Sequence, residues 1–487
     1  MTSRVPKSDH RLTDVKREFF DGVADNYLTP GPFKSYYYER LRKLVGFNVP
    51  KGSSVVELGC GVGDLLAFLQ PKRGLGIDFS TEMIDLAKER HPDLEFMAAD
   101  IQHLDIDEHF DFILLSNVVG DVVDVQRVVA GIKRLCHERT RIIIIDFNYL
   151  WGPLVKVAEL MGIKPRQRDQ NWLELADLEN LLVLEGIEPV KRGRDMVCPV
   201  KIPVISDLIN DFFGTVPGLN RLSINELLVA RKSPDTSSVD YTVSVIVACK
   251  DERGNIEELF RTVPKMGLGT EMIFVDGNSQ DGTVEEIERC MKIREELNPD
   301  LDNVRVFVQP GKGKGDAVRM GFDEAVGDVL MILDADITVR PEDLPKFYKA
   351  LVDGTGEFIN GSRLVYPMDD EAMRFLNMLG NHFFGWVFSW LLDQRLTDTL
   401  CGTKVLFKRD YEAIERGRSF FGEFDPFGDF DLLFGAAKQN LKICEVPIRY
   451  RNREYGDIKI SRFRHGLLLL KMSALAFRRF KLYRGLD

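Results

Sequence analysis

Short apolar runs alternate with helical patterns along the whole chain. The clearest runs cover residues 54–58, 110–116, 243–248 and 329–333, and each is bounded by turn residues. Runs of this length predict strands that are buried on both faces of a sheet. Because helical patterns separate the runs, the sequence predicts an α/β protein with mainly parallel sheets.

The alternation is interrupted at residues 233–240, where a cluster of Ser, Pro, Asp and Thr separates two apolar runs, INELLVA and YTVSVIVA. Such a cluster is typical of a tether between folded units. At 487 residues the chain is also too long for one hydrophobic core. The sequence therefore predicts two α/β domains, over residues 1–232 and 241–487, joined by a linker over residues 233–240.

Composition narrows the classes of function. The formal net charge of −11 argues against a protein that binds nucleic acid. Seven cysteines are scattered without a Cys-x-x-Cys pair, which indicates a reducing environment and no zinc site. The polar N-terminal stretch lacks the apolar core of a signal peptide. These features predict a cytoplasmic protein.

Two segments of the second domain favour contact with a membrane surface. Residues 375–392 are uncharged, but Asn377, Asn381 and His382 would lie unpaired in lipid, so the sequence predicts a buried or interfacial helix there. Residues 461–483 mix leucines with arginines and lysines, which suits a helix on an anionic membrane surface. Packing onto the core of the domain is the alternative. We therefore expect a peripheral protein at the inner face of the membrane.

A glycine-rich turn follows the first predicted strand. Gly59, Gly61 and Gly63 occur in the stretch ELGCGVGD, directly before a helical pattern. Glycines at such a turn let the backbone approach a ligand, and the start of a helix offers free N–H groups. Asp78 ends a second strand about 20 residues farther on, where an acid can accept hydrogen bonds from ribose hydroxyls.

These landmarks resemble those of the class I S-adenosylmethionine-dependent methyltransferases. The resemblance covers most of residues 15–232 and implies a Rossmann-like domain that binds S-adenosylmethionine. Asp78 matches the family's ribose-binding acid, and Asp100 matches the acid that meets the adenine amino group. The cofactor-binding residues that the resemblance implies are Glu57, Gly59, Gly61, Gly63, Asp78, Asp100 and Ile101.

The sequence names no catalytic base in this domain. Members of the family often work by aligning a nucleophile with the sulfonium methyl group, which needs no dedicated side chain. The conceivable contributors, each with packing or a surface position as the alternative, are Tyr27, Tyr36, Tyr37, Tyr38 and His137. A domain that binds a ligand without turnover is the alternative for the whole unit.

In the second domain, charged residues follow successive predicted strands. Asp276 ends the second strand, and the loop GKGKG, which contains Lys314, follows the third. Asp334 and Asp336 follow the buried run 329–333 in the sequence DAD. At the end of a strand, two such carboxylates can bind one Mg²⁺ or Mn²⁺ beside the diphosphate of a sugar nucleotide. A solvated acidic turn before a helix is the alternative.

This pattern resembles the family 2 glycosyltransferases of the GT-A fold, and within them the polyprenyl-phosphate branch, which includes enzymes like dolichol-phosphate-mannose synthase. The resemblance runs from about Tyr241 to the C-terminus. Asp398 and Gly402 match the loop that shapes the acceptor site. The remaining residues expected in the site are Glu252, Asp276, Lys314 and Arg363 for the sugar nucleotide, Asp334 and Asp336 for the metal ion, and Arg453 and Lys459 for catalysis on the phosphates.

The match to the family is incomplete. Four positions carry residues other than the usual ones, namely Gly277, Thr338, Cys401 and Ile458. Asp429 and Asp431 occupy the region where other members carry a catalytic general base, which a hydroxyl acceptor needs and an ionised lipid phosphate does not. Capping of the following helix is the alternative role for these two acids.

Taken together, the two resemblances predict a bifunctional enzyme. The second domain is expected to transfer a hexose with inversion from a nucleoside diphosphate sugar to a polyprenyl phosphate, with Mg²⁺ or Mn²⁺. The first domain is expected to methylate a sugar, a lipid or a pathway intermediate with S-adenosylmethionine. The alternative is a glycosyltransferase that acts on a saccharide hydroxyl, with the first domain as a ligand-binding or membrane-associated scaffold.

Overall fold

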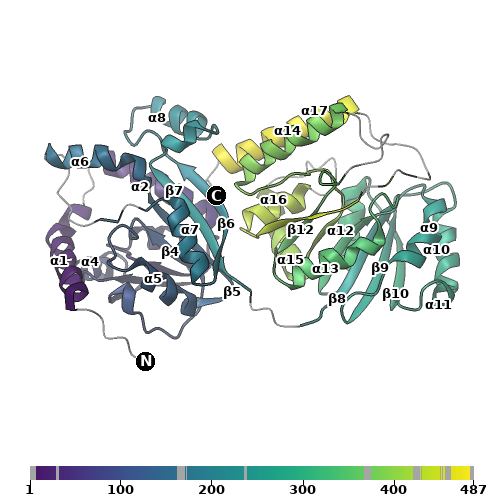
Figure 1. The fold of residues 1–487 in the computed structure, drawn as a ribbon, viewed down its shortest axis with the longest axis horizontal. Coiled ribbons are helices and arrows are strands. Elements are labelled where there is room, and N and C mark those ends of the chain that lie inside the picture. Colours follow the sequence, from purple (N-terminus) through teal and green to yellow (C-terminus); the bar gives the residue numbers. More distant parts are fainter. Residues whose placement is uncertain are drawn as a thin grey trace. The chain divides into compact units, whose positions relative to one another are not determined.

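The structure is a computed structural model, and it describes residues 7–28, 32–161, 170–171, 173–234, 239–366, 375–420, 428, 430–449, 451, 453, 455 and 462–482. The chain divides into two compact units. The first consists of Met1–Ser233 with Lys481–Asp487, and the second of Pro234–Phe480. Figure 1 shows that each unit is built around its own sheet.

The first unit contains a seven-stranded sheet in the order β3-β2-β1-β4-β5-β7-β6. Strands β1 to β5 pair in parallel, whereas β7 runs antiparallel to both β5 and β6. The predicted runs 54–58 and 110–116 are confirmed as strands. The strands are β1 (Ser54–Leu58), β2 (Arg73–Asp78), β3 (Glu95–Ala98), β4 (Phe110–Ser116), β5 (Cys136–Phe147), β6 (Ile187–Asp195) and β7 (Asn225–Lys232).

Helices cover both faces of this sheet, because alternate side chains of each strand point to opposite faces. Val56 and Leu58 pack with residues of α5 and α7, and Val55 packs with residues of α2, α3 and α4. The helices of the unit are α1 (Lys7–Val23), α2 (Pro32–Asn48), α3 (Asp64–Phe68), α4 (Thr81–Arg90), α5 (Val125–Ile132), α6 (Gly152–Leu160), α7 (Leu175–Leu184) and α8 (Ile205–Leu208). Its shorter helical turns include η1 (Ala24–Tyr27), η2 (Ile101–His103), η4 (Tyr149–Trp151), η5 (Ile209–Phe213) and η6 (Leu219–Leu222).

The second unit contains another seven-stranded sheet, in the order β10-β9-β8-β11-β13-β12-β14. Strands β8 to β11 are parallel, and β13 runs antiparallel to β11 and β12. The fully buried run at 329–333 forms most of β11, as predicted. The strands are β8 (Thr242–Cys249), β9 (Gly269–Asp276), β10 (Asn303–Val308), β11 (Val329–Asp334), β12 (Phe358–Ser362), β13 (Lys404–Phe407) and β14 (Ile443–Pro447).

This sheet is also covered on both faces. Val243, Val245 and Val247 of β8 pack with α9, α10 and α13, whereas Ile246 lies against Gly321 of α12. The helices are α9 (Ile256–Thr262), α10 (Thr283–Lys292), α11 (Arg294–Leu297), α12 (Lys314–Glu324), α13 (Leu344–Val352), α14 (Phe375–Leu392), α15 (Lys408–Arg416), α16 (Phe430–Lys438) and α17 (Arg462–Phe477).

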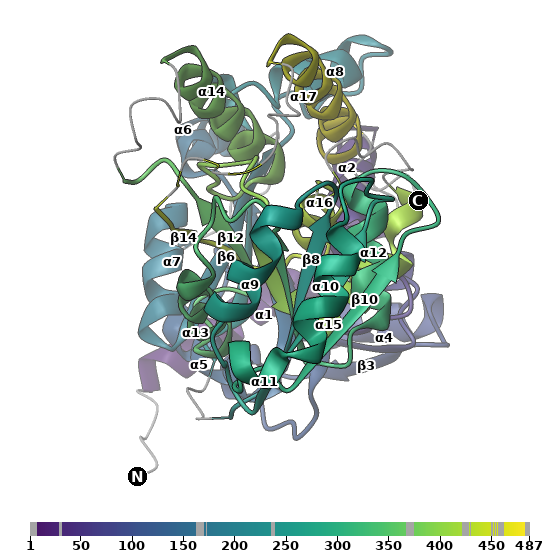
Figure 2. The ribbon, with the colours of Figure 1, turned by 90° about the vertical axis from the view of Figure 1, so that its right-hand side faces the viewer.

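The two segments predicted to contact a membrane form helices α14 and α17. Both lie on the same side of the second unit (Figures 1 and 2), and they meet where the rings of Trp390 and Phe477 lie 5.7 Å apart. Within the described part of the chain, none of the helices combines the length and the apolar character that crossing a membrane requires. The prediction of a non-spanning helix at residues 375–392 is therefore confirmed.

Candidate functional sites

A cavity of about 220 Å³ opens at the carboxyl ends of β1, β2 and β4 in the first unit. Its walls include four residues that the sequence assigned to a cofactor, namely Glu57, Gly59, Gly61 and Asp78. A pocket at the carboxyl edge of a parallel sheet is where α/β proteins bind ligands.

The glycine-rich turn leaves no room for a side chain at Gly59 or Gly63. Gly59 has φ +78°, and a Cβ atom there would lie 2.5 Å from Cγ2 of Val118. Gly63 has φ +77°, and its Cβ atom would lie 2.6 Å from the ring of Phe96. A Cβ atom on Gly61 would meet nothing within 4 Å. The turn therefore presents bare backbone at Gly61, as a close approach to a ligand requires.

Asp78 is hydrogen-bonded to the turn that it faces. Its carboxylate accepts hydrogen bonds from the Gly61 N–H at 2.9 Å and from the Ser80 N–H at 3.0 Å. Burial raises the pKa of Asp78, although these backbone donors lower it in part. The side chain is thus fixed at the wall of the cavity, where hydroxyl groups of a ligand could donate to it.

A smaller cavity of about 30 Å³ shares Gly59, Phe79 and Val118 with the first. Asp100 and Ile101, which the resemblance assigned to the cofactor, line it. Asp100 caps η2, because its Oδ1 accepts the Gln102 N–H at 3.0 Å. Apolar walls beside one carboxylate suit a flat base with an amino group.

Helix α1 covers this end of the site, a feature that the sequence did not reveal. Lys16 donates to the Asp121 carbonyl at 2.8 Å, and Arg17 donates to the Phe79 carbonyl at 3.0 Å. The Phe20 ring lies edge-on to the Phe79 ring at 5.6 Å. The cavity is therefore closed by a segment about 60 to 100 residues away in the sequence.

The charges around the larger cavity suit a cationic ligand with an attached carboxylate. Glu57, Asp64, Asp78 and Asp121 line the cavity, and burial raises the pKa of Glu57 to about 8. Arg42 of α2 also lines it and forms no ion pair within the part of the chain that the structure describes. S-adenosylmethionine, with its sulfonium and ammonium charges and its carboxylate, fits this arrangement.

The conceivable catalytic contributors occupy different places. Tyr27 and Tyr38 line the cavity. Tyr36 donates to Asp207 at 2.8 Å, and Tyr37 is bonded to Asn117 and Asn225. His137 lies at the start of β5, on the edge of the sheet opposite the cavity, so its side chain is remote from the cofactor residues.

In the second unit, Asp334 lies at the carboxyl end of β11, with Lys314 at the start of α12 beside it. Lys314 Nζ is 2.5 Å from Asp334 Oδ1. Burial opposes the charge of this carboxylate, but Lys314 lowers the pKa of Asp334 below its usual value. Gly402 lies against the same side chain, since its Cβ atom would be 2.0 Å from Asp334 Oδ2. The DAD motif, the GKGKG loop and the loop before β13 therefore converge.

Asp336 is held two residues farther along. Thr338 donates to its Oδ1 from Oγ1 at 2.8 Å and from N at 3.2 Å, and Arg453 lies 3.7 Å from its Oδ2. Arg453 also forms an ion pair with Glu252, whose other oxygen accepts from Asn255. Glu252, predicted to bind the sugar nucleotide, and Arg453, predicted to act on the phosphates, therefore meet directly at this site.

Three other predicted residues are tied to neighbours. Asp276, at the end of β9, accepts from Ser279 N at 2.9 Å. Arg363 forms a two-bond ion pair with Asp398, at 2.7 and 2.8 Å. Since Asp398 is fully buried, this pair orients the loop that contains Asp398 as well as the arginine.

The two acids considered as general bases differ in what the structure describes. Asp431 lies in the first turn of α16, with Arg418 at 3.3 Å and Arg319 at 3.5 Å from its Oδ2. Its Oδ1 also accepts the Leu432 N–H. Asp431 thus lies within the first turn of α16 rather than at the position before the helix, and its carboxylate is engaged by two arginines. Asp429 and Lys459 lie outside the described residues.

Asp334 and Asp336 are the residues that would hold a divalent cation. Burial and the neighbouring charge of Asp334 both raise the pKa of Asp336, which shows that negative charge is concentrated there. Hard oxygen ligands of this kind fit Mg²⁺ or Mn²⁺. A separate cluster of Glu257, Glu286 and Cys290 does not fit as well, because arginines pair with both of its carboxylates.

Comparisons with known proteins agree with this division of the chain. The model of the family Glycosyl transferase family 2 matches residues 244–414, and the model of a Methyltransferase domain matches residues 56–144. The Dolichol-phosphate mannosyltransferase of Saccharomyces cerevisiae is 40% identical over 122 residues, covering 24% of this chain and 42% of that protein. The protein of the same name from Pyrococcus furiosus is 38% identical over 223 residues, covering 45% of this chain and 59% of that protein.

The chain thus spans about half the length of these curated relatives. A solved complex of the Haloferax volcanii Trm112 methyltransferase activator with a methyltransferase matches 44% of this chain and 98% of that chain, at 20% identity and a TM-score of 0.36. That degree of likeness carries no argument about activity. The two family matches and the two sheets agree, and the chain is therefore a fusion of a Rossmann-like methyltransferase domain with a glycosyl transferase family 2 domain.

Proposed function

We propose that the second domain transfers a hexose from a nucleoside diphosphate sugar, with inversion at the anomeric carbon. The observation that carries this proposal is the convergence of Asp334, Asp336, Lys314 and Arg453 at the carboxyl edge of the sheet. An acceptor oxygen forms a bond to the anomeric carbon as the bond from that carbon to the diphosphate breaks, and the nucleoside diphosphate departs. A divalent cation would neutralise charge on the leaving diphosphate.

The chain's own residues prepare this site. Lys314 keeps Asp334 ionised, and Thr338 orients Asp336 through two hydrogen bonds. Arg453 joins Asp336 to Glu252, so a nucleotide bound at Glu252 would lie beside the acids. Preorganised charges of this kind stabilise a transition state without a reorganisation cost.

The acceptor that we propose is a polyprenyl phosphate. Two curated relatives are named as dolichol-phosphate mannosyltransferases, which supports a lipid phosphate. The ion pairs of Asp431 support it too, because its buried carboxylate is engaged by Arg319 and Arg418 rather than open to an acceptor hydroxyl, and a phosphate acceptor needs no general base. A saccharide hydroxyl is the second candidate acceptor.

A surface of the second domain suits such a lipid. Leu379, Phe383 and Trp386 of α14, with Leu467 and Leu470 of α17, are between 50% and 57% exposed. Lys471 and Arg478 are exposed on the same C-terminal segment. Apolar side chains with interspersed cations favour the interface of an anionic membrane, and we propose that this surface contacts one as a peripheral attachment.

The methyltransferase domain, we propose, binds S-adenosylmethionine in the two adjoining cavities and transfers its methyl group to a sugar, a lipid or an intermediate of the same pathway. The support is the acid-lined cavity with Asp78 and Arg42 on its walls. The bound cofactor would supply an activated methyl group. The walls would align the acceptor with it, a contribution that depends on orientation rather than on a base.

Sugar transfer is tested with UDP- and GDP-sugars, a polyprenyl phosphate and Mn²⁺, with mass spectrometry of the products. Asp336→Asn should lower donor consumption about a hundredfold or more. Asp353→Asn, an exposed acid at the end of α13, is the matched control. Equal rates for the wild-type protein and Asp336→Asn would refute the role of the acid pair.

The acceptor is tested with Asp429→Asn and Asp431→Asn. Near-normal transfer to the lipid phosphate by both variants supports a phosphate acceptor. Loss of transfer with intact binding of the sugar nucleotide would instead indicate a general base and a hydroxyl acceptor.

Cofactor binding is tested by calorimetry with S-adenosylmethionine. Asp78→Ala should weaken binding about 10- to 100-fold, because the carboxylate is lost from the cavity wall. Asp93→Ala, an exposed acid beyond α4, should change nothing. The absence of heat with the wild-type protein would favour the scaffold alternative.

A further inference from the structure

The segment between β6 and β7, residues 196–224, forms an apolar cap on the methyltransferase domain. It contains α8, η5 and η6. Its outward apolar side chains, between 42% and 78% exposed, are Ile202, Val204, Ile205, Leu208, Phe212 and Phe213. A soluble protein rarely leaves so many large apolar side chains exposed in one short segment without an interaction partner.

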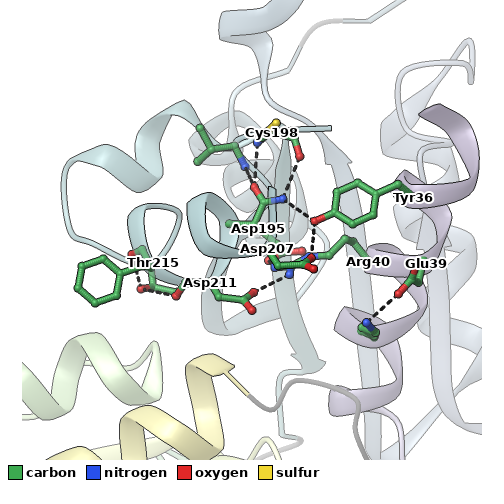
Figure 3. Close-up of polar contacts among 12 residues, drawn as sticks. Tyr36, Glu39, Arg40, Asp195, Cys198, Asp207, Asp211 and Thr215 are labelled. Atoms are coloured by element: carbon green, nitrogen blue, oxygen red, sulfur yellow. Dashed lines mark hydrogen bonds and ion pairs between the residues drawn. The ribbon is translucent and has the colours of Figure 1, made fainter. Parts of the chain in front are cut away.

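The cap is firmly attached to the domain by polar contacts on its inner side (Figure 3). Asn210 accepts from the N–H groups of Val197 and Cys198 at 2.9 and 2.8 Å and donates to the Tyr36 hydroxyl of α2 at 3.1 Å. Arg40 of α2 binds Asp211 at 2.5 Å and Asp195 at 3.0 Å. The outward apolar side chains of the cap therefore lie on a segment that is fixed to the domain.

The charged residues of the cap are two acids and two bases. Its acidic residues, Asp207 and Asp211, bind Tyr36 and Arg40. Its basic residues, Lys201 and Arg221, are exposed, although Lys201 lies 3.6 Å from Glu39. Asp207 is exposed as well, so the two acidic and two basic residues of the cap balance, and its outward surface is distinguished by its apolar side chains rather than by net charge.

Helix α6 extends the apolar surface. Leu154, Val157, Leu160 and Met161 are between 46% and 71% exposed. Trp151, just before the helix, donates to the Leu222 carbonyl of the cap at 3.1 Å, which places the two segments next to each other. The cap and α6 together are called the apolar face below.

The apolar face borders the site where the methyl group would be transferred. Asn225 directly follows the cap, and the Tyr37 hydroxyl donates to its side chain at 3.0 Å. Asn117 donates to the same hydroxyl at 2.8 Å and lines the cofactor cavity. Two hydrogen bonds therefore connect the base of the cap to the cavity wall.

We propose that the apolar face binds the surface of a phospholipid bilayer, and that it brings the cofactor cavity to a methyl acceptor held in that membrane. The part that concerns the acceptor rests on the proposed methyl transfer. Large apolar side chains that are exposed on short helices suit the interfacial layer of a membrane. The second domain carries its own apolar and basic surface on α14 and α17, and a membrane is one partner that explains both surfaces.

The test uses the full chain and vesicles of phosphatidylcholine with about one third phosphatidylglycerol. In the cap variant, Leu208→Asp with Phe212→Asp, the vesicle partition coefficient should fall about tenfold or more, because two apolar anchors are replaced by anions. The matched control is Val183→Asp with Leu184→Asp on α7, whose side chains are equally exposed on another element of the domain. The control should bind like the wild-type protein.

Because α14 and α17 could hold the chain on vesicles alone, the measurement is repeated with Leu467→Asp and Leu470→Asp in every protein. The cap variant should then remove most of the remaining binding. Unchanged binding of the cap variant in both backgrounds would overturn the proposal. So would an amide-exchange experiment in which residues 202–213 are strongly protected without vesicles, since another protein surface would then cover them.

Two further measurements separate the alternatives. If the cap variant converts a dimer to a monomer in sedimentation velocity and leaves vesicle binding intact, the occupant is a second copy and the proposal is wrong. Titration with S-adenosylmethionine should give the same Kd for the cap variant and the wild-type protein, which verifies the fold. If the wild-type protein binds vesicles through the cap but not S-adenosylmethionine, the bilayer surface stands and the proposed methyl transfer fails.

Discussion

Gly402 lies directly against the carboxylate of Asp334, so that a Cβ atom at Gly402 would be 2.0 Å from Asp334 Oδ2. Even one methyl group would therefore displace an acid of the DAD motif. Gly402→Ala should lower sugar transfer about a hundredfold, since a shift of about 1 Å in a reacting group can cost that much. The measurement is product formation under saturating donor.

The control for this substitution is Gly380→Ala in α14, where a Cβ atom would meet nothing within 4 Å. It should retain normal transfer. Normal transfer by Gly402→Ala as well would mean that Asp334 can move without consequence and would contradict its placement in the site.

Arg42 is predicted to bind the carboxylate of S-adenosylmethionine. Arg42→Met should raise the Kd of S-adenosylmethionine about 10- to 100-fold, the usual effect of losing a hydrogen bond to a charged group. Methylthioadenosine lacks this carboxylate, and its Kd should not change. Lys43→Met, at the neighbouring position on α2, is the control, because Lys43 pairs with Glu39. Equal weakening of both ligands would show a general disturbance of the cavity.

Glu57 should make the first domain less stable as the pH rises. Its pKa is raised by burial from 4.5 to about 8, so between these values the folded state binds a proton that the unfolded state has released. The free energy of unfolding therefore falls by about 1.4 kcal/mol per pH unit in this window. Glu57→Gln removes this loss.

The measurement is the Tm of the first domain without S-adenosylmethionine. The advantage of Glu57→Gln over the wild-type protein should be small near pH 5 and largest near pH 8. Glu89→Gln, on the exposed side of α4, serves as the control. An advantage that does not vary with pH would contradict the buried carboxyl.

The pair between Arg363 and Asp398 should stabilise the second domain only as long as both partners remain. Asp398→Ala removes the carboxylate that balances the largely buried Arg363 guanidinium, and the free energy of unfolding should fall by about 3–5 kcal/mol. Arg261→Ala breaks an exposed pair with Glu257 and should cost less than about 1 kcal/mol. The check is the denaturant midpoint of the transition assigned to this domain; equal shifts would refute the argument.

The parts of the fold and sites that the sequence predicted are those with local signals. An uninterrupted apolar run ending in an acid identified β11 and Asp334, and glycines after a strand identified the turn at Gly59. In these cases a few consecutive residues determine both the element and the edge of the sheet that it reaches.

The parts that the sequence did not reveal depend on contacts between distant segments. Arg17 reaches the carbonyl of Phe79, 62 positions later, and no pattern within α1 indicates this. Arg42 is one of several charged residues on α2, and only the folded cavity distinguishes it from Lys43. The antiparallel direction of β13 likewise follows from its pairing with β11 rather than from its own four residues.

The two reversed strands, β7 and β13, have a shared consequence for specificity. An antiparallel strand begins at the edge of the sheet where its parallel neighbours end. The segment that precedes such a strand therefore lies at the carboxyl edge, where α/β proteins bind ligands. Residues 196–224 lie at this edge because they precede β7, and residues 397–403 lie at the corresponding edge of the second sheet because they precede β13. The first segment can change in length or in its side chains without altering the cavity residues at the ends of β1 and β2. The second segment tolerates less change, because Gly402 lies directly against Asp334, so under the proposed sugar transfer a new acceptor preference must be sought in side chains rather than in loop length.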